Sequence, residues 1–303
     1  MLICTHNPRI EYLAKTLDGI RCQTTPVCDS ELIVVDNASD QPLADRIDLS
    51  WHPAGRCVRE ERKGLIYARL RGFRESIGDL IILSDDDNVL APDYTAHAQR
   101  IAQEWPMLGV WGGHIEPVFE VPLPAWAVPY LHHLAIRTIA APRWSSFVVD
   151  RTMPYGAGQC IRRRVADGYV ESAGREKSLE CFNRRSSGAG DGDDAFLCYV
   201  AQKLGFGEGL FPELKLQHLI PKERFNPEYF VRIARGNAHV AMLLMLRDCA
   251  GKRFHRRLAW PALRFLGACI IYHGMKRRVC CAQARGEIAA CLEYRRECQR
   301  PGA

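Results

Sequence analysis

Three consecutive aspartates, Asp85, Asp86 and Asp87, directly follow the apolar run Leu80–Leu83. Carboxylates this close repel one another, and holding them beside an apolar core costs free energy unless a cation compensates. Hard divalent cations such as Mg²⁺ bind carboxylate oxygens together with substrate phosphates and water. Because Asp85 and Asp87 are two residues apart at a predicted strand end, both can reach one ion. The triplet therefore indicates a cation site, with a solvated acidic turn as the alternative interpretation.

Further charged residues suit a nucleotide or a reacting hydroxyl. Asp36 ends the run "ELIVVD" and could accept a hydrogen bond from a base or a ribose, or could cap a helix. Arg69 and Arg71 in "YARLRG" could offset the acidic triplet or grip a diphosphate, and could equally form a solvated helix face. Asp193 and Asp194 follow a glycine-rich stretch, where a carboxylate is either a general base or a helix cap.

His218, Lys222 and Arg224 lie together in "HLIPKER". A histidine near a strand end is either a ligand or a packed side chain. The two basic residues could contact a phosphate or remain surface charges. The pattern alone leaves these alternatives open.

Apolar segments before these polar residues predict alternating strands and helices. These segments are residues 1–5, 31–36 and 79–84 for strands and residues 10–20 and 64–78 for helices. Such alternation favours an α/β fold with a parallel sheet flanked by helices, in which ligands bind at the carboxyl ends of the strands. The polar residues at Thr5, at Asp36 and at Asp85 fall at those ends, so we expect them to form one edge of the sheet.

Beyond Asp93 the pattern is weaker. Residues 109–129 are rich in proline and aromatic residues and predict an irregular surface or edge-strand region. The remaining predicted elements are a strand and helix within 155–171, a flexible segment at 186–192 before a helix ending at Gly205, a short strand at 213–221, a long helix at 226–250 and a basic, amphipathic helical tail.

The 303-residue chain is 47% hydrophobic and 25% charged, an ordinary globular composition. Residues 251–303 hold twelve Lys and Arg against three Glu, a net charge of +9, so the remainder carries −3 of the total +6. The basic tail points to an anionic surface. Thirteen cysteines, odd in number and without metal-finger spacing, predict free thiols in a reducing cytosol. We find no secure membrane span in the sequence.

Six segments in this order resemble the family 2 glycosyltransferases, which have the nucleotide-sugar-binding GT-A fold. They are "CTHNP", "LIVVDNASD", "KGLIYARLRGF", "GDLIILSDDDNVLAPDY", "GDDAFLCYVAQKLGFG" and "HLIPKERF". The resemblance implies a Rossmann-like, mostly parallel central sheet flanked by helices, in a catalytic domain of roughly residues 1–240. It places a nucleotide-sugar half at about 1–95 and an acceptor half at about 96–240, followed by a helical basic extension at 241–303.

The resemblance also implies roles for individual residues. Thr5 and Asn7 match the segment that cradles the base, and Asp36 matches the aspartate that holds the base or the ribose. Arg69 matches a basic residue near the diphosphate. The candidates for nucleotide-sugar binding are Thr5, Asn7, Asp36, Arg69, Asp86 and Arg224.

The same resemblance assigns the metal site and the base. Asp85 and Asp87 match the DxD motif that binds Mg²⁺ or Mn²⁺, and His218 matches a histidine that completes this site in some GT-A enzymes. Asp194 matches the catalytic base. Because this chain has Asp-Asp where the family has Glu-Asp, both Asp193 and Asp194 are catalytic candidates.

Family 2 enzymes are inverting, so the implied reaction is a single displacement at the anomeric carbon. The implied partners are a nucleoside-diphosphate sugar donor and a glycan or lipid-linked acceptor, in synthesis of a cell-surface polysaccharide or glycolipid. We expect a cytoplasmic protein whose tail either docks on an anionic membrane surface or packs on the core. The alternatives are nucleotidyl transfer and a catalytically inactive sugar-nucleotide-binding or scaffold protein. Nucleic-acid binding is not expected, because the basic residues are confined to the tail.

Overall fold

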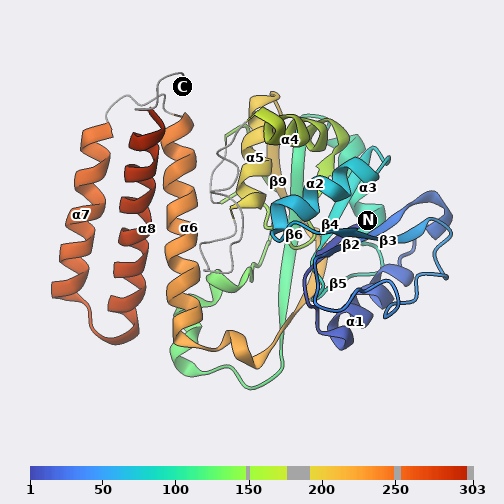
Figure 1. Cartoon of the computed structure of the whole chain (residues 1–303), viewed down its shortest axis with the longest axis horizontal. Helices are drawn as coiled ribbons and strands as arrows, with labels where there is room; N and C mark the ends of the chain where they lie inside the picture. Colours follow the sequence, from blue (N-terminus) through green and yellow to red (C-terminus); the bar gives the residue numbers. More distant parts are fainter. Residues whose placement is uncertain (148–150, 176–191, 249–253, 299–303) are drawn as a thin grey trace. The chain divides into compact units, whose positions relative to one another are not determined.

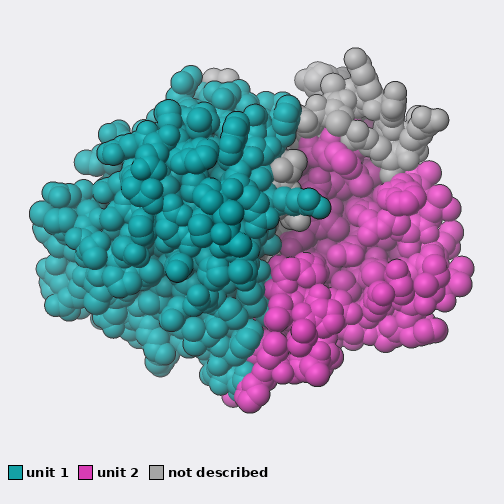
Figure 2. Space-filling view, turned by 180° about the vertical axis from the view of Figure 1, so that it is seen from behind, with its two compact units in different colours: residues 1–121, 134–181, 193–221 teal, residues 122–133, 182–192, 222–303 magenta. Residues whose placement is uncertain are grey.

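The computed structural model describes residues 1–147, 151–175, 192–248 and 254–298. The chain divides into two compact units, shown in different colours in Figure 2. The first comprises residues 1–121, 134–181 and 193–221, and the second comprises residues 122–133, 182–192 and 222–303. The predicted flexible segment at 186–192 lies outside the described residues except for Gly192.

The first unit is built on a sheet with the strand order β3-β2-β1-β4-β8-β6-β9-β5, and β7 pairs with β9 (Figure 1). The strands are β1 Leu2–Thr5, β2 Leu32–Asn37, β3 Gly55–Glu60, β4 Leu80–Ser84, β5 Asn88–Leu90, β6 Leu108–Phe119, β7 Arg143–Ser145, β8 Cys160–Arg162 and β9 Gly207–Ile220. The first four in the spatial order are parallel, and β6 and β9 form another parallel pair. The predicted α/β fold with a central sheet is therefore confirmed.

Helices α1 (Ile10–Arg21) and α2 (Leu65–Glu75) pack on the parallel strands from opposite faces. Successive side chains of a strand point to opposite faces of the sheet. Ile3 accordingly packs in a cluster with the apolar residues of α1, whereas Leu2 lies against Gly72 of α2. A Cβ at Gly72 would lie 2.4 Å from Leu2 Cδ1, so the glycine allows α2 to approach β1 closely.

The second half of the sheet has its own apolar cluster, which includes Tyr94, Trp111 and Phe211. The remaining helices of the first unit are α3 Tyr94–Glu104, α4 Arg163–Arg175 and α5 Asp193–Lys203. The chain also has short 3₁₀ helices, which are η1 Val27–Asp29, η2 Ala125–Leu134 and η4 Lys222–Arg224. The predicted helices before Asp93 and after Gly192 are present, and helix α4 follows β8 directly.

Strand β6 shows that the prediction for residues 109–129 was wrong in part. Residues 108–119 form one continuous strand between β8 and β9, and its first half is buried. Gly113 is needed there, because a Cβ would lie 2.0 Å from the carbonyl oxygen of Leu214. The glycines of this segment therefore mark close packing of two strands and not a break in regular structure.

Strand β9 is longer than predicted and contains a bulge. Gly113 of β6 pairs with Phe211, whereas the next residue, His114, pairs with Lys215. Residues 212–214 of β9 therefore have no paired residue in β6. Pro212, which lacks a backbone N–H, can lie there without loss of a hydrogen bond between the strands. Beyond the bulge the pairing with β6 continues without interruption to the end of β9.

The second unit contains the long helices α6 (Pro227–Asp248), α7 (Phe254–Ile271) and α8 (Gly274–Cys298), with α8 lying between α6 and α7 (Figure 1). Helix α6 continues through residue 240, where the predicted catalytic domain ends. Gly286 of α8 lies against α6, since a Cβ would be 2.1 Å from the carbonyl oxygen of Arg235. Among the described residues we find no helix with the length and apolar character of a membrane span.

Candidate functional site

The carboxyl ends of β1, β2 and β4 lie side by side at one edge of the sheet. Thr5 pairs in register with Asp36, and the same strand pairs with β4, which ends just before Asp85. The Thr5 hydroxyl donates a hydrogen bond to the carboxylate of Asp86. We call this edge the polar rim and define it by Thr5, Asp36 and Asp85–Asp87. The structure therefore brings these predicted site residues together.

Asp36 is held in its ionised form by several donors. Its carboxylate accepts hydrogen bonds from the backbone N–H groups of Ser39, at 3.0 Å, and Leu43, at 3.2 Å. Arg59 of β3 forms an ion pair with it at 2.7 Å. Burial acts to raise the pKa of Asp36, but the hydrogen bonds outweigh burial and lower the pKa below its usual value. The sequence did not predict a role for Arg59. Arg59 is recognised by its position opposite Asp36 in the pairing of β2 and β3, which only the structure provides.

Asn7 lies at the outer part of the rim and fixes the loop after β2. Its side chain donates to Asp40 Oδ2 at 3.0 Å, and its backbone N–H donates to Ser39 Oγ at 2.9 Å. Asn7 and Ala38 both have a φ of 51°, in the left-handed region that non-glycine residues rarely adopt. This uncommon backbone at the ends of β1 and β2 is typical of functional edges.

Asp87 and His218 meet although they are far apart in the sequence. His218 Nε2 lies 3.3 Å from Asp87 Oδ2, and both side chains are buried. Asn88 Nδ2 donates to Asp87 Oδ1 at 3.0 Å. Asn88 stands opposite His218 in the antiparallel pairing of β5 and β9, so this short pairing sets the position of His218 at the acidic triplet.

A buried ion pair lies beneath the rim. The guanidinium of Arg69 is 2.8 Å from Asp193 Oδ2, and both side chains are almost fully buried. The Tyr169 hydroxyl donates to Asp193 Oδ1, and burial raises the pKa of Tyr169, which keeps this donor protonated. Burial acts to lower the pKa of Arg69, but the negative charges of Asp193 and Asp194 raise it. Asp193 is therefore a structural partner of Arg69 and Tyr169.

Asp194 has different surroundings from Asp193. It is only partly buried, and its Oδ2 accepts a hydrogen bond from the backbone N–H of Gly156 at 3.0 Å. Gly156 also lies against Arg69, since a Cβ at this position would be 2.7 Å from Arg69 Nη2. The charge of Asp85 acts on Arg69 as well. Arg69 thus carries the positive charge that faces the carboxylates of both α5 and the polar rim.

Arg224 belongs to the second unit and is described there alone. It ends η4, and its guanidinium carbon lies 6.0 Å from the centroid of the Tyr229 ring. The predicted contact with a phosphate stays a prediction for this residue.

The donor set at the rim suits a hard divalent cation that is completed by its substrate. Within the described ranges no group of three or more His, Cys, Asp and Glu side chains is arranged to hold a metal by itself. Magnesium, however, is commonly held by one or two carboxylates, with phosphate oxygens and water as the other ligands. Asp85 and Asp87 supply such carboxylates, and His218 lies beside Asp87. The residues therefore fit a metal that arrives with a diphosphate.

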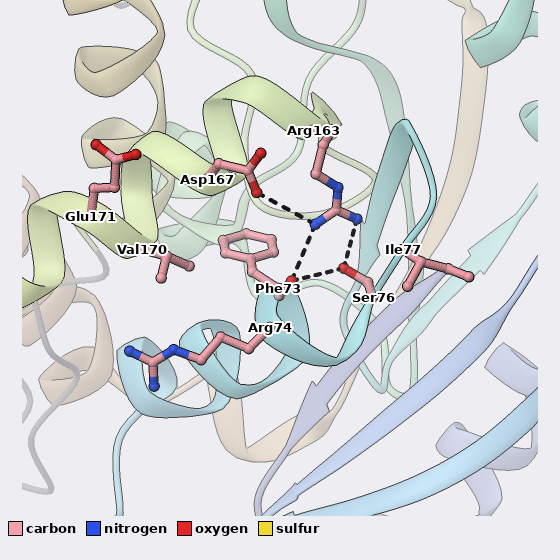
Figure 3. Close-up of a pocket in the computed structure, with 8 residues that line it drawn as sticks. All are labelled: Phe73, Arg74, Ser76, Ile77, Arg163, Asp167, Val170 and Glu171. Atoms are coloured by element: carbon pink, nitrogen blue, oxygen red, sulfur yellow. Dashed lines mark hydrogen bonds and ion pairs between the residues drawn. The ribbon is translucent and has the colours of Figure 1, made fainter.

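A shallow hollow at the opposite edge of the sheet does not belong to this site (Figure 3). It lies where α2 ends before β4 begins, beside α4. Arg163 of α4 closes it by donating to the Phe73 carbonyl oxygen at 3.1 Å and to Ser76 Oγ at 2.9 Å. Arg163 is also paired with Asp167 in its lining, and the carboxyl ends of β1, β2 and β4 lie at the other end of those strands.

Comparison with solved structures defines the class of fold. The structure superposes on residues 1–349 of TarS from S. aureus with a TM-score of 0.52, covering 98% of this chain and 90% of that chain at 12% sequence identity. The sheet and its flanking helices are thus those of the GT-A fold.

Sequence comparison gives the family. Residues 1–140 match the model described as glycosyl transferase family 2. The uncharacterized glycosyltransferase YwdF of Bacillus subtilis (strain 168) is 31% identical over 104 residues, which cover 34% of this chain and 37% of that protein. The match thus spans little more than a third of that relative. The first 140 residues are thus similar to the glycosyltransferase family 2 domain, in keeping with the resemblance of the sequence motifs.

Proposed function

We propose that this protein is a metal-assisted, inverting glycosyltransferase that moves a sugar from a nucleoside-diphosphate sugar to an acceptor hydroxyl. The observation that carries this proposal is the arrangement of Asp194 and Asp85 about Arg69. One carboxylate is partly exposed and held by a backbone donor, and the other belongs to the polar rim. A reaction that joins an acceptor hydroxyl to a diphosphate-activated sugar needs both groups near each other.

The donor nucleotide would lie along the ends of β1 and β2. Asp36 is ionised, buried and fixed by Ser39, Leu43 and Arg59, so a base N–H or a ribose hydroxyl would reach its carboxylate by displacing one of these donors. Thr5 and Asn7 border the same surface, and Asp86 is held by Thr5. We assign the nucleoside to these residues.

Asp85, Asp87 and His218 would hold the Mg²⁺ or Mn²⁺ ion. When bound, this ion would neutralise charge that develops on the departing diphosphate. The chain itself holds Asp87 in place through Asn88 and His218, and it places Asp85 toward the Arg69 cluster. The positive charge of Arg69 reduces the mutual repulsion of these carboxylates before the donor binds.

We assign the general base to Asp194. Asp193 is engaged with Arg69 and Tyr169 in a nearly dry cluster, where accepting a proton would break a buried ion pair. Asp194 is partly exposed, and the Gly156 N–H orients its carboxylate. In this scheme the acceptor oxygen attacks the anomeric carbon and its proton passes to Asp194. The bond to the diphosphate breaks, and its electron pair leaves with the nucleoside diphosphate.

Arg69 acts in this scheme as a positioning residue. It is buried against Asp193 and Gly156, so it sets the place of the first turn of α5 relative to the loop that bonds Asp194. This differs from direct binding of the diphosphate, which its family counterpart implies. The proposed acceptor is a glycan or a lipid-linked glycan of the cell surface, as the resemblance implies.

The decisive experiment compares Asp194→Asn with Asp167→Asn, an exposed carboxylate on α4. We expect Asp194→Asn to lower kcat about 10²–10⁴-fold, the usual contribution of a general base. A nucleoside diphosphate with Mg²⁺ or Mn²⁺ should still raise its melting temperature, as in the parent protein. Asp167→Asn should change neither quantity. Transfer by Asp194→Asn at the parent rate would refute the assignment, and a parent protein that binds donors but never transfers would be a binding or scaffold protein.

A further inference from the structure

Helix α7 exposes an apolar face to solvent. Among the described residues, no part of the second unit covers this face. The exposed side chains lie at helical spacing and are between 57% and 76% accessible to solvent. They are Trp260, Leu263, Leu266, Ile270 and Ile271. Isolated exposed apolar residues are normal, but a contiguous group on one helix face marks an interaction surface. We call these five residues the α7 face.

Charges are absent from the α7 face. Between residues 259 and 271 the sequence holds one charged residue, Arg264, and its guanidinium is paired with Glu287 of α8. The opposite side of α7 is packed, with Pro261 and Ala268 buried. From residue 259 onward the helix is therefore fixed to α8 by one side and presents an uncharged side to solvent. An ordinary solvated helix would place charged residues there.

Positive charge follows directly after the α7 face. Lys276 and Arg277 are exposed in the first turn of α8. The Lys276 ammonium lies 4.3 Å from the centroid of the Tyr272 ring, at the end of α7. Residues 251–303 carry a net charge of +9, from twelve basic and three acidic residues. The exposed cations Lys276 and Arg277 beside the α7 face therefore favour an anionic partner.

We infer that the α7 face docks on an anionic lipid surface. Helices that lie in a membrane interface combine an apolar face carrying Trp and Leu with Lys and Arg, and their overall hydrophobicity is too low for them to span. Trp260 suits the headgroup region, since its ring is apolar with one polar N–H. Lys276 and Arg277 would meet lipid phosphates while the five apolar side chains enter the acyl boundary. A second copy of this chain would not use the positive charge, because it carries the same charge itself.

Vesicle flotation of the full-length protein tests this inference. We expect binding to phosphatidylglycerol–phosphatidylcholine vesicles and much weaker binding to pure phosphatidylcholine. Lys276→Gln/Arg277→Gln should lower the partition constant about 25-fold, because each basic residue near an anionic surface contributes about fivefold. Leu263→Gln/Ile270→Gln should lower it about 100-fold through the lost apolar burial. Bromine-labelled lipid should quench the fluorescence of the parent protein more than that of Trp260→Phe.

Matched control variants show whether vesicle binding depends on the α7 face itself or on the protein's overall charge and hydrophobicity. Arg295→Gln/Arg296→Gln removes the same charge at the far end of α8, and Ile77→Gln/Val128→Gln removes exposed apolar residues outside α7. Both should bind vesicles within about twofold of the parent. If the parent ignores anionic vesicles, or if Leu263→Gln/Ile270→Gln binds like the parent, the inference is wrong. A dimer that dissociates in Leu263→Gln/Ile270→Gln, without vesicle binding, would assign the face to a second copy. No donor or acceptor is needed, so failure here would leave the proposed transfer reaction untouched.

Discussion

The polar rim and the α7 face are built on opposite physical principles. At the rim and beneath it, charges are partly or fully buried, and each is held by a named partner, as Asp193 is by Arg69 and Asp36 is by Arg59. On the α7 face, apolar side chains stay in solvent, and Arg264, the one charged residue between 259 and 271, is paired with Glu287 of α8. Buried charges are costly unless their partners are in place before the ligand arrives. Exposed apolar groups gain free energy only when a surface removes them from water. The polar rim is therefore preorganised for its ligand, whereas the α7 face buries its apolar side chains only when a partner surface binds.

Removing Arg69 would break the first side of this comparison most strongly. We expect Arg69→Met to destabilise the protein by about 3–5 kcal/mol, because it leaves the carboxylate of Asp193 buried without its cation. The double variant Arg69→Met/Asp193→Asn should recover much of this loss, since no uncompensated charge remains. Urea unfolding followed by circular dichroism measures both. A double variant no more stable than the single one would show that the pair is not the source of the stability.

Two glycines sharpen the comparison inside the second unit. Gly286→Ala should cost about 1–3 kcal/mol, because the added Cβ would meet the Arg235 carbonyl oxygen at 2.1 Å and push α8 from α6. Gly267→Ala on α7 should instead stabilise by up to about 1 kcal/mol, because its Cβ would meet only Ile271 Cδ1 at 3.9 Å and alanine favours helix. Thermal or urea unfolding of the two variants tests the sign. If both variants changed the free energy of unfolding equally, the packing of Gly286 and the exposure of Gly267 would not differ as described.

The smallest expected effect is a pH dependence in the second unit. Burial, reinforced by His132, lowers the pKa of His133 from 6.5 to about 4. Above pH 6.5 both folded and unfolded chains hold it neutral, so it adds no dependence on pH. Between pH 6.5 and 4 the unfolded chain binds a proton that the folded chain does not, so stability falls as the pH falls, by about 1 kcal/mol from pH 6.5 to 5.5.

Urea unfolding at several pH values would measure this loss. The variant His133→Gln should remove that part of the slope and leave the slope below pH 4 unchanged. If His133→Gln kept the parent's full slope of stability against pH between 6.5 and 4, other titratable groups would be the cause of that slope.

The sequence was informative where function and local pattern coincide. The apolar runs before Thr5, Asp36 and Asp85 predicted β1, β2 and β4, and the rule that parallel strands end at one edge predicted the polar rim. Strand β3 escaped notice because its residues, Gly55–Glu60, alternate with charges and form no apolar run. Arg59 was missed for the same reason.

Tertiary contacts explain the rest of what sequence reasoning could not reach. Asp193 and Asp194 are neighbours in the first turn of α5, and only the packing of Arg69 and Tyr169 shows which one faces inward. The basic tail was predicted, but charge counting could not show that α7 turns its uncharged side outward. Periodicity indicates that a helix has two faces, and the partner helix decides which of them is covered.

The bulge in β9 has a consequence for insertions and deletions. Side chains of a strand alternate between two faces, so adding or removing a single residue after Lys215 would turn His218 away from Asp87. Before Lys215 the three extra residues at 212–214 already loop out of the ladder, and a length change there leaves the downstream register intact. Related chains that differ in length along this strand should therefore differ at the bulge, and a frame-preserving codon deletion beyond it should abolish the site while leaving the sheet.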